Sequence, residues 1–565
     1  MYYLALASDY DGTLAEEGLV SDRTIAALEK LRGTGRKTIL VSGRELPDLK
    51  SVFKRLDLFD LMVLENGALL YNPQSGEERP LAPAPPAGFV DALAQRGVAP
   101  ISVGHAIVAT WEPHQDAVLA VIQEMGLELE IIFNKGAVMV LPSGVNKATG
   151  LAAALAELGL SPHNVAGVGD AENDHAFLRS CGCSVAVANA LPAVKQTADL
   201  VTAGARGEGV EELIAVLEED EDRLVRIEGN RIAFGKADDG RAVEIEPPDV
   251  LLIAGTSGIG KSTFATALTE KLVDRRFQFC VLDPEGDYLE LENATVVGDS
   301  KTTPSVEQVI ELLAQGQNVV VAALALSIEE RPELFAKLLP ELARLRASKG
   351  RPHWIVIDET HHLIPAERGA GPIVLPSELA GCLLITVHPR ALAVELLQKV
   401  TKVAALGPVA PEVIGEVASA LRIAPPAPLA APEGKKVLVW AVGRPEVAAA
   451  EVDLPRQSHK RHTRKYAEGE LDEENSFYFR GPDNRLNLRA RNLMAFLDLA
   501  AGVDDATWQH HLRAGDYSRW FKERIKDDDL AAAAAAIEED KSLPAAESRD
   551  RIAEAVKQRY TVPAA

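Results

Sequence analysis

The stretch Gly255-Thr256-Ser257-Gly258-Ile259-Gly260-Lys261-Ser262 follows the apolar run Val250–Ala254 and precedes Thr263–Leu268, a segment with helical character. A strand, a glycine-rich turn, a Lys-Ser pair and a helix form, in this order, the sequence context of a P-loop. The glycines let backbone N–H groups converge on phosphate oxygens at a helix N-terminus. An ordinary glycine-rich turn is disfavoured by the full motif and its flanks. The chain is therefore predicted to bind a nucleoside triphosphate.

In this P-loop, Lys261 is expected to reach the terminal phosphates and the Ser262 hydroxyl to take one Mg²⁺ position. The nucleotide is expected to be ATP, bound as a substrate. The residues predicted to surround it are Gly255, Ser257, Gly258, Gly260, Lys261, Ser262 and Thr263.

Composition limits the classes of protein that the chain can belong to. Its 565 residues correspond to about three or four domains, and 47% of them are apolar, enough for large cores. The formal net charge of −24 argues against a broad basic surface for nucleic acid, although a locally basic channel inside an oligomer is not excluded. No run approaches the length of a membrane span, and no basic segment opens the chain. We therefore expect a soluble cytoplasmic protein without membrane contact.

A second phosphate-handling site is indicated near the N-terminus. Residues 1–215 alternate short apolar strands with helical segments, which is typical of a parallel α/β sheet. The strand Tyr3–Ser8 ends in Asp9-Tyr10-Asp11-Gly12-Thr13, at the edge where open α/β sheets place their sites. One carboxylate can attack phosphorus and the other can protonate the leaving oxygen, while a cation offsets their shared charge. An Asp-x-Asp pair without further motifs often lies in a solvent-exposed turn that has no catalytic role.

Three further segments place polar residues after apolar strands. They are Ser42-Gly43-Arg44, Asn146-Lys147-Ala148-Thr149-Gly150 and Asp170-Ala171-Glu172-Asn173-Asp174. With Asp9–Thr13, this ordered set of four resembles the motifs of the haloacid dehalogenase superfamily.

The resemblance implies phosphoryl transfer through an aspartyl-phosphate. Asp9 would be the nucleophile and Asp11 the general acid and base. Thr13 and Ser42 would steady the transferring phosphoryl group, and Lys147 would neutralise it. The implied Mg²⁺ ligands are Asp9, the backbone carbonyl of Asp11 and Asp170, with Asn173 and Asp174 in support.

A long insert between Ser42 and Lys147 begins with a proline-rich segment, Pro80–Pro86. It resembles the α/β cap of the Cof-type and sucrose-phosphate-phosphatase-like branch, as does Glu65-Asn66-Gly67-Ala68. Such a cap implies a small phosphorylated metabolite and disfavours the end of a polymer. His105, Trp111, Glu112 and His114 are weak candidates for substrate selection, because residues of these types are more often structural or exposed.

After the P-loop, three strands also end in polar residues. The first precedes Asp283-Pro284-Glu285-Gly286-Asp287-Tyr288, the second ends in Asp358-Glu359, and the third ends at His388-Pro389-Arg390. Asp358 is expected to position Mg²⁺ through water, and Glu359 to polarise the attacking water. His388 is a candidate sensor of the γ-phosphate, and Arg390 is expected to act in cis or across a subunit boundary.

This set resembles the HerA/FtsK group of P-loop motors over residues 224–455. The resemblance implies ATP hydrolysis and a homo-oligomer, which in that group is a hexameric ring. It supports these two properties more strongly than it supports DNA pumping. His388 stands where many relatives use Gln, so this candidate sensor departs from the pattern of the group.

The predicted fold class is α/β. It comprises a Rossmann-like core of residues 1–84 and 142–218 with an inserted cap of residues 85–141, and a RecA-like P-loop domain of residues 224–455. A small, mainly helical domain of residues 466–565 follows. A hairpin turning at Gly229-Asn230 and a helical face over residues 486–501 are also expected. The basic segment Pro455–Lys465 fits a linker or a contact with phosphate or a neighbouring subunit equally well.

The predicted function is a Mg²⁺-dependent phosphomonoester hydrolase fused to an ATP-hydrolysing motor or regulatory domain. One alternative is a polynucleotide kinase–phosphatase, which also joins these two types of fold. The cap and the Asp358-Glu359 pair count against it, because a kinase needs an acceptor base rather than a water-activating Glu. The other alternative is a nucleotide-gated oligomeric scaffold that regulates the phosphatase.

Overall fold

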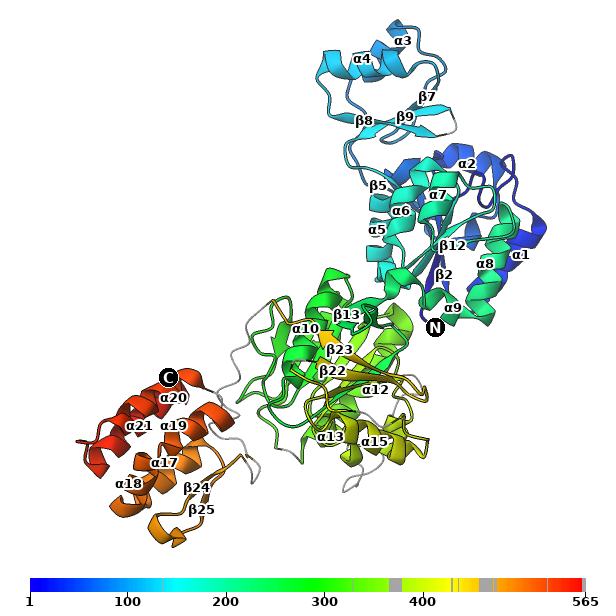
Figure 1. The fold of residues 1–565 in the computed structure, drawn as a ribbon. Helices are drawn as coiled ribbons and strands as arrows, with labels where there is room; N and C mark the ends of the chain where they lie inside the picture. Colours follow the sequence, from blue (N-terminus) through cyan, green and yellow to red (C-terminus); the bar gives the residue numbers. More distant parts are fainter. Residues whose placement is uncertain are drawn as a thin grey trace. The chain divides into compact units, whose positions relative to one another are not determined.

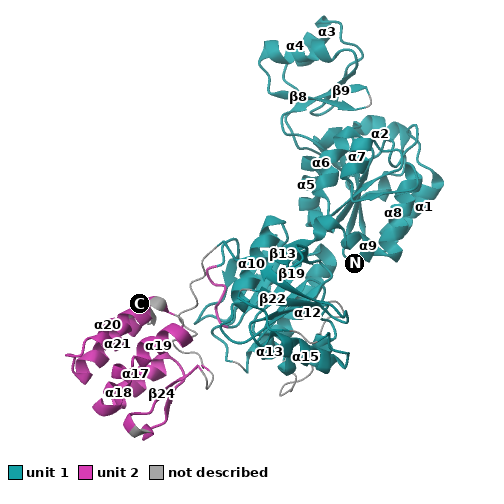
Figure 2. Cartoon of the chain, in the orientation of Figure 1, with its two compact units in different colours: residues 1–284, 291–456 teal, residues 285–290, 457–565 magenta. Residues whose placement is uncertain are grey.

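The computed structural model describes residues 1–134, 136–327, 329–364, 379–427, 430–434, 436–456, 471, 475–525 and 527–560 (Figure 1). Contacts divide the chain into two compact units, residues 1–284 with 291–456 and residues 285–290 with 457–565 (Figure 2). Each of the four predicted parts contains a cluster of buried apolar residues, while the predicted boundaries between them stay a proposal. Residues 457–465 of the basic segment lie outside the described residues.

The N-terminal core is an eight-stranded sheet of order β12-β11-β10-β1-β2-β3-β4-β5. Neighbouring strands from β12 to β3 are parallel, and β4 and β5 add antiparallel pairs. The strands are β1 (Ala5–Ser8), β2 (Lys37–Val41), β3 (Leu61–Leu64), β4 (Leu69–Asn72), β5 (Glu77–Pro80), β10 (Val165–Gly169), β11 (Cys183–Ala186) and β12 (Leu200–Val201). Every residue of β1 and β10 is buried, as expected for central strands covered on both faces.

Seven helices belong to the same part of the described chain. They are α1 (Asp22–Gly33), α2 (Leu46–Val52), α5 (Lys147–Leu158), α6 (His175–Ser180), α7 (Pro192–Thr197), α8 (Gly207–Glu219) and α9 (Glu221–Val225).

The cap is an antiparallel sheet of order β6-β7-β9-β8 with two helices on one side (Figure 1). Its elements are α3 (Phe89–Gln95), β6 (Ser102–Val103), β7 (Val108–Trp111), α4 (Gln115–Met125), β8 (Leu129–Asn134) and β9 (Ala137–Pro142). Phe89 and Leu93 of α3 and Val118 of α4 pack with Val108 and Val140 of the sheet. The opposite face of the sheet is therefore left to the pocket described below.

The P-loop domain contains an eleven-stranded sheet of order β14-β13-β23-β22-β21-β15-β20-β19-β16-β18-β17. Neighbouring strands are parallel along the part of the sheet that runs β21-β15-β20-β19-β16-β18-β17. Along the part that runs β14-β13-β23-β22-β21, neighbouring strands are antiparallel. The strands are β13 (Ile232–Ala237), β14 (Ala242–Ile245), β15 (Val250–Ala254), β16 (Phe279–Asp283), β17 (Thr295–Val297), β18 (Val319–Ala322), β19 (Trp354–Ile357), β20 (Cys382–Thr386), β21 (Lys402–Leu406), β22 (Lys436–Ala441) and β23 (Val447–Val452). The helices are α10 (Lys261–Asp274), α11 (Val306–Ala314), α12 (Arg331–Lys349), α13 (Thr360–Leu363), α14 (Val394–Leu397) and α15 (Ala410–Leu421).

The hairpin predicted at Gly229-Asn230 is wrong. Residues Glu228–Asn230 form a 3₁₀ turn, and the hairpin instead joins β13 to β14. The reason is that Asn230 is buried and its Nδ2 donates to the Tyr3 hydroxyl and to the carbonyl of Val225. The Gly-Asn pair thus anchors the chain on the N-terminal core before the sheet begins.

The second unit holds an aromatic-rich helical core formed around Phe477, Phe496, Trp508 and Tyr517. Its elements are β24 (Phe477–Phe479), β25 (Leu488–Ala490), α17 (Leu493–Gly502), α18 (Asp505–Ala514), α19 (Asp516–Trp520), α20 (Asp528–Glu539) and α21 (Ala545–Tyr560). The helix predicted over residues 486–501 begins only at Leu493, because residues 488–490 pair with β24 and Asn492 caps the helix. The predicted α/β fold class with a mainly helical end is confirmed.

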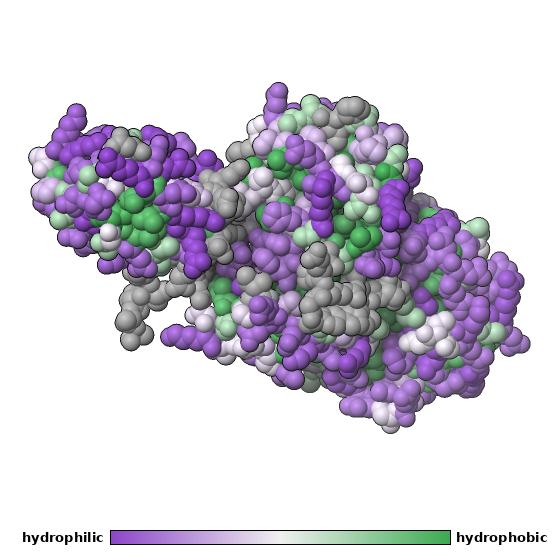
Figure 3. All heavy atoms as spheres, turned by 90° about the horizontal axis from the view of Figure 1, so that it is seen from below, coloured by the Kyte–Doolittle hydropathy of each residue, from purple (hydrophilic) through white to green (hydrophobic). Residues whose placement is uncertain are grey.

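The face of the molecule drawn in Figure 3 is largely hydrophilic, with hydrophobic residues in separate patches, as is usual for protein surfaces. Among the described residues, no helix combines the length and hydropathy needed to cross a bilayer.

Candidate active site

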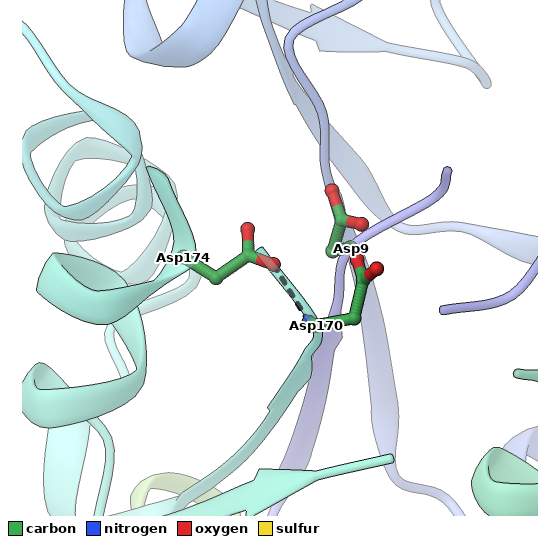
Figure 4. A group of neighbouring side chains, drawn as sticks. All are labelled: Asp9, Asp170 and Asp174. Carbon is green, nitrogen blue, oxygen red and sulfur yellow. Dashed lines mark hydrogen bonds between the residues drawn. The ribbon is translucent and has the colours of Figure 1, made fainter. Parts of the chain in front are cut away.

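Two parallel strands bring the acidic residues of the N-terminal region together. Strands β1 and β10 are paired with Ser8 opposite Val168, so Asp9 and Asp170 leave the same edge of the sheet. Carboxylate oxygens of Asp9, Asp170 and Asp174 all lie within 4.8 Å of one another, and the three residues are buried (Figure 4). The structure therefore brings together these three residues, which the resemblance implies as Mg²⁺ ligands.

Lys147 lies within this cluster as the first residue of α5. Its Nζ donates to Oδ1 of Asp9 and to Oδ1 of Asp174, each at 2.6 Å, and its side chain is 1% exposed. The preceding Asn146 caps the helix by accepting from the backbone N–H groups of Ala148 and Thr149. This cap fixes where the helix begins and hence where the ammonium group points.

Burial and mutual repulsion dominate the electrostatics of the cluster. Burial, and secondly the charge of Asp174, raises the pKa of Asp9 to about 7 although Lys147 opposes this. Burial would lower the pKa of Lys147, but the charges of Asp174 and Asp9 outweigh it and raise that pKa above its ordinary value. Three buried carboxylates thus share one buried ammonium, and the balance of charge is negative.

The donor set fits a magnesium ion. Mg²⁺ prefers carboxylate and carbonyl oxygens, and a divalent cation would offset the excess negative charge of the three carboxylates. The carboxylate of Asp174 is held beside Asp170, because its Oδ2 accepts from the backbone N–H groups of Asp170 and Ala171 at 2.8 and 2.9 Å (Figure 4). Asn173 donates from Nδ2 to Oδ1 of Asn66 at 3.0 Å.

The hydroxyl residues predicted to contact phosphate are both buried. Thr13 donates from Oγ1 to Oδ1 of Asp170 at 3.2 Å, so it is in contact with a candidate metal ligand. The Oγ of Ser42 accepts from the backbone N–H of Arg44 at 3.2 Å.

Arg44 is a residue to which the sequence assigned no role. Its Nε and Nη2 donate to the two carboxylate oxygens of Asp11 at 2.6 and 2.7 Å. Its Nη1 donates to Asp48 at 2.6 Å. A bidentate pair fixes both the position and the plane of a carboxylate, so Arg44 orients the candidate general acid. The signal available in the sequence was its place two residues after Ser42.

Glu65 was also missed as a structural link between core and cap. Its carboxylate is 1% exposed and accepts from the backbone N–H groups of His105, Ala106 and Ile107 at 2.9 to 3.3 Å. A Cβ atom at Gly104 would lie 2.6 Å from Cδ of Glu65, so glycine is required for this close approach. The Glu65-Asn66-Gly67-Ala68 motif was the signal.

A cavity of about 640 Å³ lies between the core and the cap. Asp9, Asp11 and Arg44 line it from the core, and Trp111 lines it from the cap. The other three weak candidates, His105, Glu112 and His114, do not line it; His105 instead contacts Glu65 and Glu78, and His114 contacts the carbonyl of Ala99.

The P-loop residues lie at the carboxyl edge of the second sheet. Gly258 and Gly260 have φ values of 76° and 104°, which favour glycine, and α10 begins at Lys261 directly after them. The Nζ of Lys261 donates to the carbonyl of Thr256 at 3.0 Å. Gly255, Ser257, Ser262 and Thr263 belong to the same loop and first turn.

Sheet order brings the other predicted nucleotide-site residues to this edge. Strand β20, which leads to His388, lies between β15 of the P-loop and β19, which leads to Asp358 and Glu359. His361, which the sequence did not single out, has its Nδ1 3.2 Å from Oγ1 of Thr386 and 3.4 Å from Oε2 of Glu359.

Arg390 is 73% exposed and its Nε lies 3.1 Å from Oε1 of Glu416. Its predicted action on a nucleotide, in cis or in trans, stays a proposal.

Comparison with known proteins identifies both regions. The family of haloacid dehalogenase-like hydrolases matches residues 6–113 and 126–214, and the central domain of helicase HerA matches residues 250–349. A phosphoglycolate phosphatase of Methanothermobacter thermautotrophicus is 29% identical over 37% of this chain and 96% of its own length. Phosphoglycolate phosphatase 2 of Saccharolobus solfataricus is 30% identical over 37% of this chain and 91% of its own length. A solved haloacid dehalogenase-like hydrolase of Bacteroides thetaiotaomicron is 20% identical over 38% of this chain and 99% of that chain, with a TM-score of 0.35.

The chain therefore belongs, through its N-terminal region, to the haloacid dehalogenase-like hydrolases. It is an enzyme in which that hydrolase is joined to a HerA-type P-loop domain, and both predicted resemblances are confirmed. The HerA match ends at residue 349, before Asp358, Glu359 and His388, so the roles of these residues stay proposals.

Proposed function

We propose that the N-terminal region is a Mg²⁺-dependent phosphatase that acts on a small phosphorylated metabolite through an aspartyl-phosphate. The observation that carries this proposal is the buried cluster in which Lys147 donates to Asp9 and Asp174 beside Asp170. The names of the relatives, phosphoglycolate phosphatases, support phosphomonoester hydrolysis.

Each chain residue has a step in this reaction. A carboxylate oxygen of Asp9 attacks phosphorus while Lys147 offsets the phosphate charge, and the bond from phosphorus to the ester oxygen breaks. Asp11, oriented by Arg44, gives its proton to that leaving oxygen. Asp11 then takes a proton from the water that attacks phosphorus, which releases inorganic phosphate and restores Asp9. Mg²⁺ held by Asp9, Asp170 and the Asp11 carbonyl would supply further positive charge at the phosphate.

The second half of the proposal concerns ATP. We infer that the P-loop domain hydrolyses ATP, with Lys261 and Ser262 at the phosphates and Mg²⁺, and with Asp358 and Glu359 acting on metal and water. A homo-oligomeric ring, with His388 and Arg390 near the γ-phosphate, and a cytoplasmic location belong to this proposal as well.

Paired variants test the two activities separately. Asp9→Asn is expected to abolish phosphate release from small phosphomonoesters and to leave ATP hydrolysis intact, whereas Lys261→Ala is expected to do the reverse. Phosphomonoester turnover that survives in Asp9→Asn would refute the nucleophile. Incubation with 5′-hydroxyl DNA and labelled ATP tests the polynucleotide kinase alternative, and label on DNA would establish it. ATP-dependent assembly with negligible turnover would establish the scaffold alternative.

A further inference from the structure

We propose that the phosphatase pocket selects a phosphomonoester whose organic group is uncharged and hydroxylated, and that Glu45 and Asp48 exclude a second anionic group. This inference rests on the proposed phosphatase function. It names the substrate class as a polyol or sugar monophosphate, in contrast to phosphoglycolate, which carries a carboxylate beside its phosphate.

The charges that line the pocket on the core side are mostly negative. Beyond the nucleophile Asp9, the lining contains Asp11, Glu45 and Asp48 and one guanidinium, Arg44. Arg44 already binds both oxygens of Asp11 and one oxygen of Asp48, at 2.6 to 2.7 Å. Two carboxylates therefore share the guanidinium of Arg44, whose charge is offset before a substrate arrives, and Glu45 adds a further carboxylate to this wall.

Glu45 lies where it can act on the organic group of the substrate. It is half-buried immediately before α2, and its Oε1 accepts a hydrogen bond from the hydroxyl of Ser102 on the cap. The organic group must leave the phosphate past Asp11, because Asp11 protonates the leaving oxygen. A carboxylate on that group would enter a space bordered by the carboxylates of Glu45 and Asp48, and like charges placed together are costly.

The cap wall of the pocket is uncharged. In the cap sheet Ser102 is opposite Ala109, Ala109 is opposite Met139, and Trp111 is opposite Ala137. Residues that are directly opposite or two apart share one face of a sheet, so these five side chains lie on the face away from α3 and α4. All five line the pocket.

This wall offers an apolar surface, an indole ring and three uncharged polar residues, Ser102, Thr110 and Asn134. Trp111 is 53% exposed, although a large aromatic side chain gains by covering its surface. An indole face against C–H groups, together with carboxylates that accept from hydroxyls, suits a polyol. The cavity of about 640 Å³ is also of the size that holds drug-sized ligands, far larger than a two-carbon substrate needs.

Two matched pairs of substrates test the proposal in the full-length protein with Mg²⁺. Phosphoglycolate is compared with 2-hydroxyethyl phosphate, and 6-phosphogluconate with sorbitol 6-phosphate; in each pair a carboxylate replaces a CH₂OH group. The wild type is expected to show a kcat/KM at least about tenfold higher for the neutral member. In Glu45→Gln, the ratio of kcat/KM for the neutral member to kcat/KM for the carboxylated member is expected to fall about tenfold. Asp91→Asn is the control for the loss of one charge, because Asp91 is exposed on α3 and does not line the pocket.

Ionic strength provides a readout that a purely structural role of Glu45 would not change. Salt screens repulsion between partly exposed charges. Added salt is therefore expected to lower the wild-type ratio of kcat/KM between the neutral and the carboxylated substrate, and to lower this ratio less in Glu45→Gln. A wild type that prefers the carboxylated members, or a ratio that Glu45→Gln leaves unchanged, would overturn the charge selection. Phosphate release that persists in Asp9→Asn would instead refute the phosphatase mechanism on which the inference rests.

Discussion

The raised pKa of Asp9 predicts that the catalytic cluster costs stability in the metal-free protein. The substitution Asp9→Asn keeps the shape of the side chain and removes its ability to ionise. The ordinary pKa of this carboxyl is 3.8, and burial together with Asp174 raises it to about 7 in the folded chain. A raised pKa favours folding at low pH, and this contribution is lost as pH rises through 7. Above that pH the wild type must bury an ionised Asp9, and the variant does not.

The magnitude follows from the linkage between proton binding and stability. Each pH unit between the ordinary and the raised pKa corresponds to about 1.4 kcal/mol. Between about pH 5.5 and pH 8, the stability of Asp9→Asn relative to wild type is therefore expected to grow by about 2 kcal/mol. The variant still offers an amide oxygen to Lys147, which also keeps its contact with Asp174.

Hydrogen exchange in chelator-containing buffer measures this local stability in the full-length chain. Peptides that cover β1 and β10 report on the cluster. A growth of about 2 kcal/mol corresponds to a roughly thirtyfold change, between the two pH values, in the ratio of wild-type to variant exchange rates. Asp91→Asn is the matched control and is expected to show no pH-dependent difference. Mg²⁺ is expected to protect the wild type more than the variant. If the stability of Asp9→Asn relative to wild type did not grow between the two pH values, burial and repulsion would not raise the pKa of Asp9, and the reasoning would fail.

Three further substitutions test single contacts. Arg44→Lys removes the planar pair of N–H donors that binds both oxygens of Asp11. Steady-state phosphate release from phosphomonoesters is therefore expected to show a kcat that is about tenfold lower or more, with a smaller change in KM. Glu65→Gln weakens the acceptor of three backbone N–H groups, and exchange of residues 104–108 is expected to report about 1–3 kcal/mol less protection. Glu359→Gln is expected to lower ATP hydrolysis at least about 100-fold while a fluorescent ATP analogue still binds and the phosphatase is unaffected; unchanged hydrolysis would show that another residue activates the water.

The parts of both sites that the sequence predicted depend on one local rule. Asp9, Asp170 and Lys147 each follow an apolar strand or start a helix, and carboxyl ends of parallel strands meet at one edge. The same rule brought Lys261, Asp358 and His388 to one edge of the second sheet. Position along a strand or helix thus brings these residues to one edge of a sheet, whereas the resemblance to known families supplies the roles proposed for them.

The residues that the sequence did not assign act through partners that no local pattern reveals. Arg44 was visible next to Ser42, but its pairing with Asp11 depends on how β1 and β2 lie side by side. Glu65 was visible as part of a motif, but its three donors belong to the cap, about forty residues further along the chain. The same limitation explains the misplaced hairpin, since the buried partner of Asn230 is Tyr3, at the opposite end of the N-terminal region. A local motif identifies the chemistry that a residue can perform, whereas groups such as Glu45 of the core and Trp111 of the cap come together only because core and cap line one cavity. The substrate of this phosphatase must therefore be argued from the charges of that cavity rather than from the four motifs.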